Sequence, residues 1–246
     1  MLRNGLALIK FGSSVLRGET DLPVVVEEIA RWLGSGQNVL VVVSAFGNTT
    51  EELFRKARSF GGETNQEAVA RLVATGEEAS AALLALALAR GGIVAKVLGP
   101  EQMRLIAEGA PLDARLRTVR ANRIWSAFTE SDVVVVPGFI ARTPQGNTVL
   151  LGRGGSDLTA VFLAHELRAS RCRLVKDVDG LYTSDPKSAN GVRPERLERL
   201  GWEKALGIGG GVVQAKALEF ARENRVRFEV AAVGRAEGTV VGEEVP

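Results

Sequence analysis

The chain has 246 residues, of which 46% are hydrophobic and 24% charged, and its formal net charge is +2. This composition is that of a globular protein, and the length suits one α/β unit, so we expect a single domain over residues 1–246. Because basic and acidic residues are interspersed along the sequence, there is no basic stripe of the kind that binds nucleic acid. The expected partner is therefore a small molecule.

The cysteine content and the apolar runs favour a cytoplasmic protein with no membrane partner. Cys172 is the lone cysteine and cannot form an internal disulfide or a zinc site by itself. Residues 1–10 are too short for a signal-peptide apolar region, and no uninterrupted apolar run reaches the roughly 18 residues of a membrane span. The longest run, residues 79–89, follows two glutamates and ends at Arg90, which is typical of a buried core helix.

Strand and helix patterns alternate along the chain. Short β-branched runs, apolar almost throughout, predict parallel strands covered on both faces at residues 6–10, 38–44, 92–98, 132–137, 172–176 and 226–230. Helical patterns lie between them at residues 23–33, 66–90, 113–128, 157–167 and 213–223. This alternation predicts a doubly wound α/β sandwich, with a hairpin turn at 142–148 and an exposed loop at 188–192.

Glycine and small polar residues follow several of these predicted strands, at positions 12–14, 44–50 and 138–155. In open α/β sheets, ligands bind in the crevice beyond the carboxyl ends of the strands. The strongest stretch is Leu151-Gly-Arg-Gly-Gly-Ser-Asp157, which opens a helical pattern and suits a phosphate or a carboxylate. An ordinary glycine turn with Ser156 or Asp157 as the helix N-cap is the structural alternative, but it leaves Arg153 unexplained.

Lys10 ends the first predicted strand, directly before Gly12-Ser13-Ser14. Its ammonium group could reach a transferring phosphoryl group, whose stabilisation needs mainly positive charge and positioning; a solvated strand-end lysine is the alternative. The sequence has neither a GxxxxGK[ST] P-loop nor a GxGxxG strand-to-helix turn, so P-loop NTPases and Rossmann dehydrogenases lose their main support.

Further charged residues allow two interpretations each. Asp177, Asp179 and Asp185 follow a predicted strand and could hold Mg²⁺ with its waters or orient lysines, although a solvated Asp-Gly turn would explain Asp179. Glu77 is expected at the start of a long apolar helix, where the helix dipole alone could account for it. His165, the only histidine, has no catalytic partner at a telling spacing, and Cys172 is expected in the core.

In this order, the segments resemble the catalytic domain of aspartokinases, within the amino-acid kinase family. The family patterns KFGGTSV, VVVSAMGKTTD and STGE are similar to residues 10–15, 41–51 and 74–77. The likeness continues through residues 138–140, 152–157 and 177–187, and residues 237–240 resemble the family's closing strand. It covers nearly the whole chain, and GRGGSD with DVDGxYTxDP is highly specific as a pair. The segment KFGSSV is one residue shorter than the aspartokinase pattern and closer to glutamate 5-kinases.

The resemblance implies a three-layer α/β sandwich with a mainly parallel central sheet, the amino-acid kinase fold, that uses ATP and Mg²⁺. Lys10 and Asp157 would be catalytic, with Lys10, Gly12, Ser13 and Ser14 holding the β- and γ-phosphates. Arg153 would bind the α-carboxylate of an amino acid and Glu77 its α-amino group, a charge match that physical reasoning also favours. The whole amino-acid site would comprise Ser44, Thr50, Glu77, Phe139, Arg153 and Ser156. The nucleotide would also contact Asp177, Tyr182 and Lys187.

Two departures from the family pattern concern positive charge near the nucleotide. The family's GAKVLH segment, whose lysine is expected near the ATP phosphates, corresponds here to residues 209–214 and has a glycine at position 211. Lys176 stands where the family has a threonine, and either supplies a charge to the nucleotide from another direction or crowds it.

Aspartokinases also normally continue into regulatory ACT domains, so the chain is expected to be either a piece of a longer enzyme or a free-standing relative.

The reaction that the resemblance implies is ATP-dependent phosphorylation of the side-chain carboxylate of L-aspartate to 4-phospho-L-aspartate, a step of amino-acid biosynthesis. Two alternatives stay open. One is a sister kinase acting on glutamate or another small carboxylate, and the other is a non-catalytic ligand-binding relative, which the glycine at position 211 keeps possible. Family members are usually dimers, so the resemblance also implies a homodimer.

Overall fold

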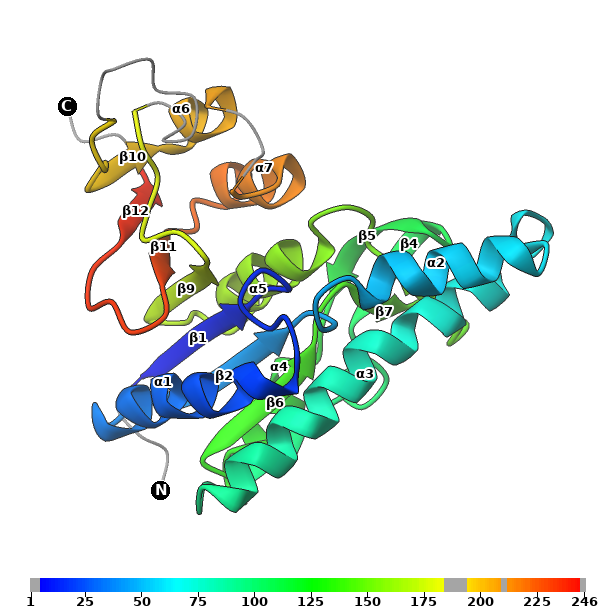
Figure 1. Cartoon of the computed structure of the whole chain (residues 1–246), viewed down its shortest axis with the longest axis horizontal. Coiled ribbons are helices and arrows are strands. Elements are labelled where there is room, and N and C mark those ends of the chain that lie inside the picture. The colour runs from blue at the N-terminus through cyan, green and yellow to red at the C-terminus, as the bar shows by residue number, and fades with distance from the viewer. Residues whose placement is uncertain (1–4, 184–193, 209–211, 244–246) are drawn as a thin grey trace.

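A computed structural model describes residues 5–183, 194–208 and 212–243, and its centre is an eight-stranded sheet (Figure 1). The strand order is β10-β12-β11-β9-β1-β2-β6-β3, and all neighbours are parallel except β11 and β12. Each of the six predicted runs contributes one strand, so the prediction of a mainly parallel sheet is confirmed. The strands are β1 (Leu6–Phe11), β2 (Asn38–Val43), β3 (Ala95–Val97), β6 (Val133–Pro137), β9 (Arg171–Lys176), β10 (Arg199–Gly201), β11 (Phe228–Ala232) and β12 (Thr239–Gly242).

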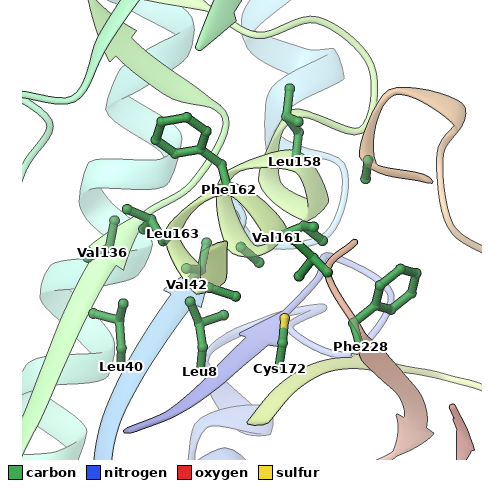
Figure 2. Close-up of a cluster of buried hydrophobic side chains, with 14 of the residues drawn as sticks. Leu8, Leu40, Val42, Val136, Leu158, Val161, Phe162, Leu163, Cys172 and Phe228 are labelled. Atoms are coloured by element: carbon green, nitrogen blue, oxygen red, sulfur yellow. The ribbon is translucent and has the colours of Figure 1, made fainter. Parts of the chain in front are cut away.

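Helices cover both faces of this sheet, which makes the expected three layers. One face carries α1 (Leu22–Gly34) and α3 (Gln66–Arg90), and the other carries α4 (Ala121–Ala127), α5 (Gly155–Glu166) and α7 (Ala215–Glu223). Successive residues of a strand point to opposite faces. Leu8 and Leu40 therefore pack beneath α5 with Phe162 (Figure 2), whereas Ile9 and Val41 pack with α1 and α3. Cys172 belongs to the α5 side of the core, as expected.

A second sheet of four strands, in the order β5-β4-β7-β8, corrects one prediction. Residues 113–128 were expected to form a helix, but they form strand β5 (Asp113–Thr118) and the short helix α4. Ala114 and Leu116 alternate with charged residues, the period of a strand with one buried face, and β5 pairs with β4 (Ile106–Ala110). The hairpin turn expected at 142–148 is confirmed, because it joins β7 (Ile140–Arg142) to β8 (Thr148–Leu150).

In the described part of the chain, two α-helices lie in segments that the sequence did not mark as helical: α2 (Thr49–Ser59) and α6 (Trp202–Gly207), which follows β10. Among the described helices, α3 alone is long and apolar enough to cross a membrane by length and composition. Ala81, Leu84 and Leu88 of α3 are fully buried against the sheet, as expected of a core helix, whereas Leu86 is exposed. The loop expected at 188–192 lies outside the described residues.

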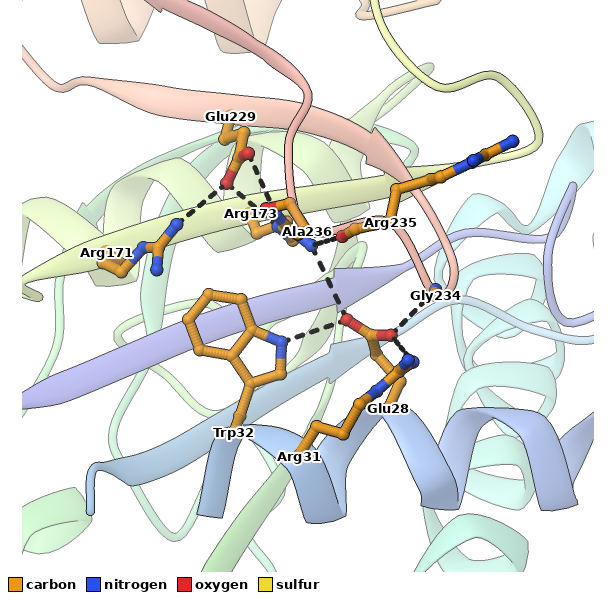
Figure 3. A network of polar contacts seen from close by, with 9 residues as sticks. All are labelled: Glu28, Arg31, Trp32, Arg171, Arg173, Glu229, Gly234, Arg235 and Ala236. Atoms are coloured by element: carbon orange, nitrogen blue, oxygen red, sulfur yellow. Dashed lines mark hydrogen bonds and ion pairs between the residues drawn. The ribbon is translucent and has the colours of Figure 1, made fainter. Parts of the chain in front are cut away.

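A buried polar network joins α1 to β9 and to the turn between β11 and β12 (Figure 3). The guanidinium of Arg173 donates two hydrogen bonds to Glu229, at 2.9 and 2.8 Å, and lies 3.6 Å from Glu28. Arg173 also donates to the carbonyl oxygens of Arg235 and Ala236, at 2.7 and 2.8 Å. Since β9 ends at Lys176, this network fixes the strand that carries one of the predicted site residues.

Candidate active site

The predicted site residues come together at the carboxyl edge of the central sheet. Strands β9, β1, β2 and β6 are adjacent and parallel, so the loops that follow them meet at one edge. A cleft of about 1250 Å³ opens there. All the described residues that the sequence singled out for the site line it: Lys10, Gly12, Ser13, Ser14, Ser44, Thr50, Glu77, Phe139, Arg153, Ser156, Asp157, Lys176, Asp177 and Tyr182. Lys187, the remaining predicted residue, lies outside the described residues.

Asp157 lies between two lysines at the middle of the cleft. The Nζ atom of Lys10 is 2.6 Å from Oδ1 of Asp157, and the Nζ atom of Lys176 is 2.7 Å from Oδ2. The side chains of Lys10 and Asp157 are only 6% and 3% exposed, and that of Lys176 is 11% exposed. Two ammonium groups thus share one buried carboxylate, and the exposed Asp177 adds only a solvent-screened attraction to Lys176.

The ionisation of Asp157 and of Lys176 follows from their burial and from the charges around them. Burial acts to raise the pKa of Asp157, but attraction to Lys10 and Lys176 outweighs it and holds the pKa below its usual range. Burial, together with repulsion from Lys10, lowers the pKa of Lys176 to about 8, although Asp157 acts in the opposite direction. Asp157 is therefore ionised at neutral pH and orients the two cations.

The glycine loop delivers Asp157 through the first turn of α5. Gly154 is the N-cap residue with φ of 78°, and no side chain caps the helix, so the alternative that Ser156 or Asp157 is the N-cap is wrong. A Cβ atom at Gly154 would lie 2.2 Å from Cβ of Gln214, and one at Gly155 would lie 2.7 Å from the ring of Phe139. Side chains are thus excluded at these two positions, and the N–H of Gly155 donates to the carbonyl of Gly152 at 3.0 Å. The next N–H groups of this first turn have no acceptor within the helix and belong to residues that line the cleft.

Glycine also leaves space beside Lys10. The carbonyl oxygen of Gly12 accepts hydrogen bonds from the N–H groups of Val15 and Leu16, both at 2.9 Å, which closes a tight turn after β1. A Cβ atom at Gly12 would lie 2.7 Å from Nζ of Lys10. The absence of that atom leaves the ammonium group room to sit over the turn.

Glu77 lies inside α3, not at a helix start. The helix begins at Gln66, so the first-turn dipole explanation is wrong. The residue is 1% exposed, and Oε1 accepts a hydrogen bond from the N–H of Ala45 at 3.3 Å, whereas Oε2 has no hydrogen-bond partner among the described residues. Burial raises the pKa of Glu77 to about 8. An unpaired, buried carboxylate that lines a cleft is suited to a ligand ammonium group.

Two further residues shape this end of the cleft. Phe139, which follows β6, has φ of 66°, a left-handed conformation that is uncommon for a bulky residue and concentrates at functional sites. Its N–H donates to the hydroxyl of Thr159 at 3.2 Å, and that hydroxyl donates to the carbonyl of Gly155 at 2.8 Å. Arg153 is exposed in the glycine loop and has no ion-pair partner among the described residues. Its guanidinium is thus available to an anionic ligand group.

The other end of the cleft contains the segment after β9. Asp177 and Tyr182 line it, and the hydroxyl of Tyr182 donates to Asp179 at 2.6 Å, so Asp179 is more than a solvated turn residue. Asp185 and the glycine at position 211 lie outside the described residues. No group of three His, Cys, Asp or Glu side chains among the described residues could hold a metal ion.

Sequence reasoning assigned no role in the site to Thr239, which supports this segment from β12. Thr239 is fully buried; its hydroxyl accepts from the N–H of Leu181 at 2.8 Å and donates to the carbonyl of Leu197 at 2.5 Å. A Cβ atom at Gly180 would lie 2.6 Å from this hydroxyl. Threonine is common in strands, so only the position of Thr239 in the fold reveals this supporting role. His165 takes no part in the cleft and contacts Phe220 edge-on, with ring centroids 5.9 Å apart.

Comparison with known proteins agrees with this architecture. The sequence profile of the Amino acid kinase family matches residues 5–231. The chain belongs to the amino acid kinase family. Its relatives include the aspartokinase of Geobacillus stearothermophilus, 34% identical over 245 residues, which cover 98% of this chain and 60% of the relative. The aspartokinase of Thermus thermophilus is 34% identical over 228 residues, 92% of this chain and 56% of the relative.

Solved structures of this family have the same fold. Aspartate kinase from Synechocystis superposes with a TM-score of 0.84 and 29% identity, covering 98% of this chain and 40% of that chain. UMP kinase from Bacillus anthracis shares the fold alone, with a TM-score of 0.70 and 17% identity over 100% of this chain and 98% of that one. This family member spans about 55–60% of the length of the curated aspartokinases that it matches.

Proposed function

We propose that this chain is the kinase unit of an aspartokinase, and that it transfers the γ-phosphoryl group of ATP to the side-chain carboxylate of L-aspartate. The observation that carries the proposal is the order of charges along one cleft. Glu77 lies beside the loop after β2, the group Lys10–Asp157–Lys176 lies beyond β1, and Tyr182 follows β9. The 34% identity to aspartokinases over nearly the whole chain supports aspartate as the substrate.

This order assigns the two substrates to opposite ends of the cleft. The amino acid binds on the side of β2 and β6, with its ammonium group at Glu77 and its α-carboxylate at Arg153, and Ser44, Thr50, Phe139 and Ser156 complete this site. The nucleotide binds on the side of β9, against Asp177, Tyr182 and Lys187, with its phosphates over Gly12, Ser13 and Ser14. The side-chain carboxylate and the γ-phosphate then meet at the two lysines.

The chemistry needs no protein base. A carboxylate oxygen of aspartate forms a bond to the γ-phosphorus atom, and the bond from that phosphorus to the oxygen bridging to the β-phosphate breaks, so that ADP leaves with the electron pair. Because the acceptor is already ionised, no proton has to be removed. Lys10 neutralises charge on the transferring group, and Asp157, held ionised by its two lysines, orients them instead of accepting a proton.

Mg²⁺ is expected to enter with ATP, as it does for kinases in general. It would shield the charge of the phosphates in that complex. Among the described residues no group of three His, Cys, Asp or Glu side chains could hold a metal ion, and both carboxylate oxygens of Asp157 are engaged by lysines. The roles of this chain's residues are therefore to bind, orient and neutralise.

The assay that tests the proposal is ADP release with Mg·ATP and a panel of small acids, with hydroxylamine added to trap any acyl phosphate. Aspartate should give ADP and a hydroxamate in equal amounts. Preference for glutamate or another acid would replace aspartate as the substrate while keeping the kinase. Absence of turnover with every acid, together with measurable nucleotide binding, would instead favour the non-catalytic relative.

We further propose one kinase domain that works as a homodimer in the cytoplasm. The continuous central sheet, to which segments from both ends of the described chain contribute, supports one domain. The dimer is an expectation from the family, and light scattering at several protein concentrations tests it. The cytoplasm is where ATP is abundant, and localisation of the tagged protein in cells tests that expectation.

A further inference from the structure

Lys176 lies where the two substrates would meet, and its burial there has an energetic cost. It occupies the last position of β9, and its side chain is 11% exposed within the cleft. Taking a lysine out of water costs free energy unless a partner compensates for it. Its carboxylate partner, Asp157, already pairs with Lys10, so Asp157 by itself cannot neutralise both ammonium groups.

The position of Lys176 relative to Lys10 follows from the sheet. Strands β1 and β9 are parallel neighbours, with Lys10 opposite Leu174, and the two side chains converge from these strands on the two oxygens of one carboxylate. The first turn of α5, whose N-terminus has no side-chain cap, lies at the same place because Asp157 belongs to it. Two cations and a helix N-terminus thus surround one buried carboxylate, and the second negative charge that faces Lys176, Asp177, is exposed to solvent and therefore screened.

We propose that Lys176 contacts the γ-phosphoryl group of ATP directly and is a second catalytic cation of the phosphoryl transfer. The proposal rests on the proposed kinase function. An incoming phosphoryl group, which carries negative charge on its equatorial oxygens, neutralises the excess charge of the lysine pair. The attraction between Lys176 and the phosphates strengthens as negative charge develops on the oxygen that bridges the β- and γ-phosphorus atoms. Lys10 and Lys176 then contact the transferring phosphoryl group from two adjacent strands, while Asp157 holds the two ammonium groups in position, one at each carboxylate oxygen.

The protonation state of Lys176 makes its contact with the γ-phosphoryl group sensitive to pH. The charged groups that face it are Asp157 from α5, Lys10 from β1 and Asp177 at the end of its own strand. With a pKa of about 8, the free protein holds Lys176 as ammonium at pH 7 and as neutral amine at pH 9. A bound phosphate favours the charged form, so nucleotide binding above pH 8 should take up a fraction of a proton.

The kinetic test compares Lys176→Met with Lys96→Met in the full chain. Lys96 forms a 2.7 Å ion pair with Glu130 on the surface, so the control removes a similar pair outside the cleft. With Mg·ATP and aspartate, Lys176→Met should lower kcat by about a hundredfold and change KM for ATP only a few-fold. Lys96→Met should leave both unchanged. A Lys176→Met protein that is folded and keeps kcat within about threefold overturns the proposal.

A binding test separates this inference from the kinase assignment. A non-hydrolysable ATP analogue is titrated calorimetrically at pH 8.5 in two buffers of different ionisation enthalpy. The wild-type chain should take up part of a proton, whereas Lys176→Arg, which is charged throughout, should take up none. Equal proton uptake by the two proteins contradicts the contact even if the wild type is an active kinase. Proton uptake by the wild type alone supports it even if no acid is phosphorylated.

Discussion

The backbone N–H of Ala45 donates a hydrogen bond to Oε1 of Glu77 at 3.3 Å, which ties the loop after β2 to the middle of α3. The second oxygen of the same carboxylate has no partner among the described residues. One oxygen is thus used to hold the side chain in place, and the other is left for a ligand.

The first prediction concerns the ammonium group of the substrate. Aspartate should exceed succinate in kcat/KM by about a hundredfold or more, because succinate leaves the buried Glu77 without a cation. In Glu77→Gln the preference should fall at least about tenfold. Parallel assays of the two acids with both proteins measure this. Equal use of aspartate and succinate by the wild type would show that Glu77 does not bind an ammonium group.

The second prediction follows from the pKa of Glu77, which burial raises to about 8. The folded state binds a proton more tightly than the unfolded state, so this residue's contribution to stability is complete below about pH 4.5 and is lost as the pH rises towards 8. Replacing it by Gln removes that loss. The Tm of Glu77→Gln minus the Tm of the wild type should therefore be larger at pH 8.5 than at pH 5, by at least about 3 °C. A constant difference would mean that Glu77 ionises normally.

The third prediction concerns Lys10, whose ammonium lies 2.6 Å from Asp157. Lys10→Met should lower kcat by about a hundredfold or more, as loss of one electrostatic contact to a transition state does elsewhere. The pKa of Asp157 should also rise, since one of the two cations that hold it down is gone. Steady-state kinetics with Lys96→Met as the control test the first effect. An unchanged rate would remove Lys10 from the catalytic centre.

The fourth prediction concerns Thr239, which positions the nucleotide side of the cleft without contacting it. Thr239→Val keeps the shape but leaves the N–H of Leu181 and the carbonyl of Leu197 unpaired, at a cost of about 1–3 kcal/mol. KM for ATP should rise more than KM for aspartate. Thr239→Ser keeps the hydroxyl and should restore ATP binding. A purely structural role would instead lower stability and leave both KM values alone.

The fifth prediction compares two arginines of β9 that lie over the ring of Trp32, Arg171 at 4.7 Å and Arg173 at 5.2 Å. Arg173 is 3% exposed and binds Glu229, whereas Arg171 is 51% exposed. Arg173→Met should lower the free energy of unfolding by about 3–5 kcal/mol, because it removes the buried cation between Glu28 and Glu229 and the donor to two carbonyl oxygens. Arg171→Met should cost about 1 kcal/mol or less. Urea unfolding measures both, and equal losses would contradict the role assigned to burial.

Some errors of the sequence interpretation have identifiable physical causes. Residues 113–128 were assigned to a helix because their polar and apolar residues fit a helical period over a long window. The alternation of Ala114 and Leu116 with charged residues was the stronger signal, but its partner β4 was not recognised. Glu77 was placed at a helix start because the apolar run begins just after it, although the helix itself begins at Gln66.

The sequence by itself determined the central strands and most of the residues that line the cleft. Parallel strands buried on both faces require continuous apolar runs, and loops that admit a ligand require glycine, so both leave local signals. The tertiary structure alone decided that Lys10, Asp157 and Lys176 meet and that Thr239 supports Leu181. Those contacts join segments far apart in the chain. They depend on the order of strands in the sheet, which local periodicity does not encode.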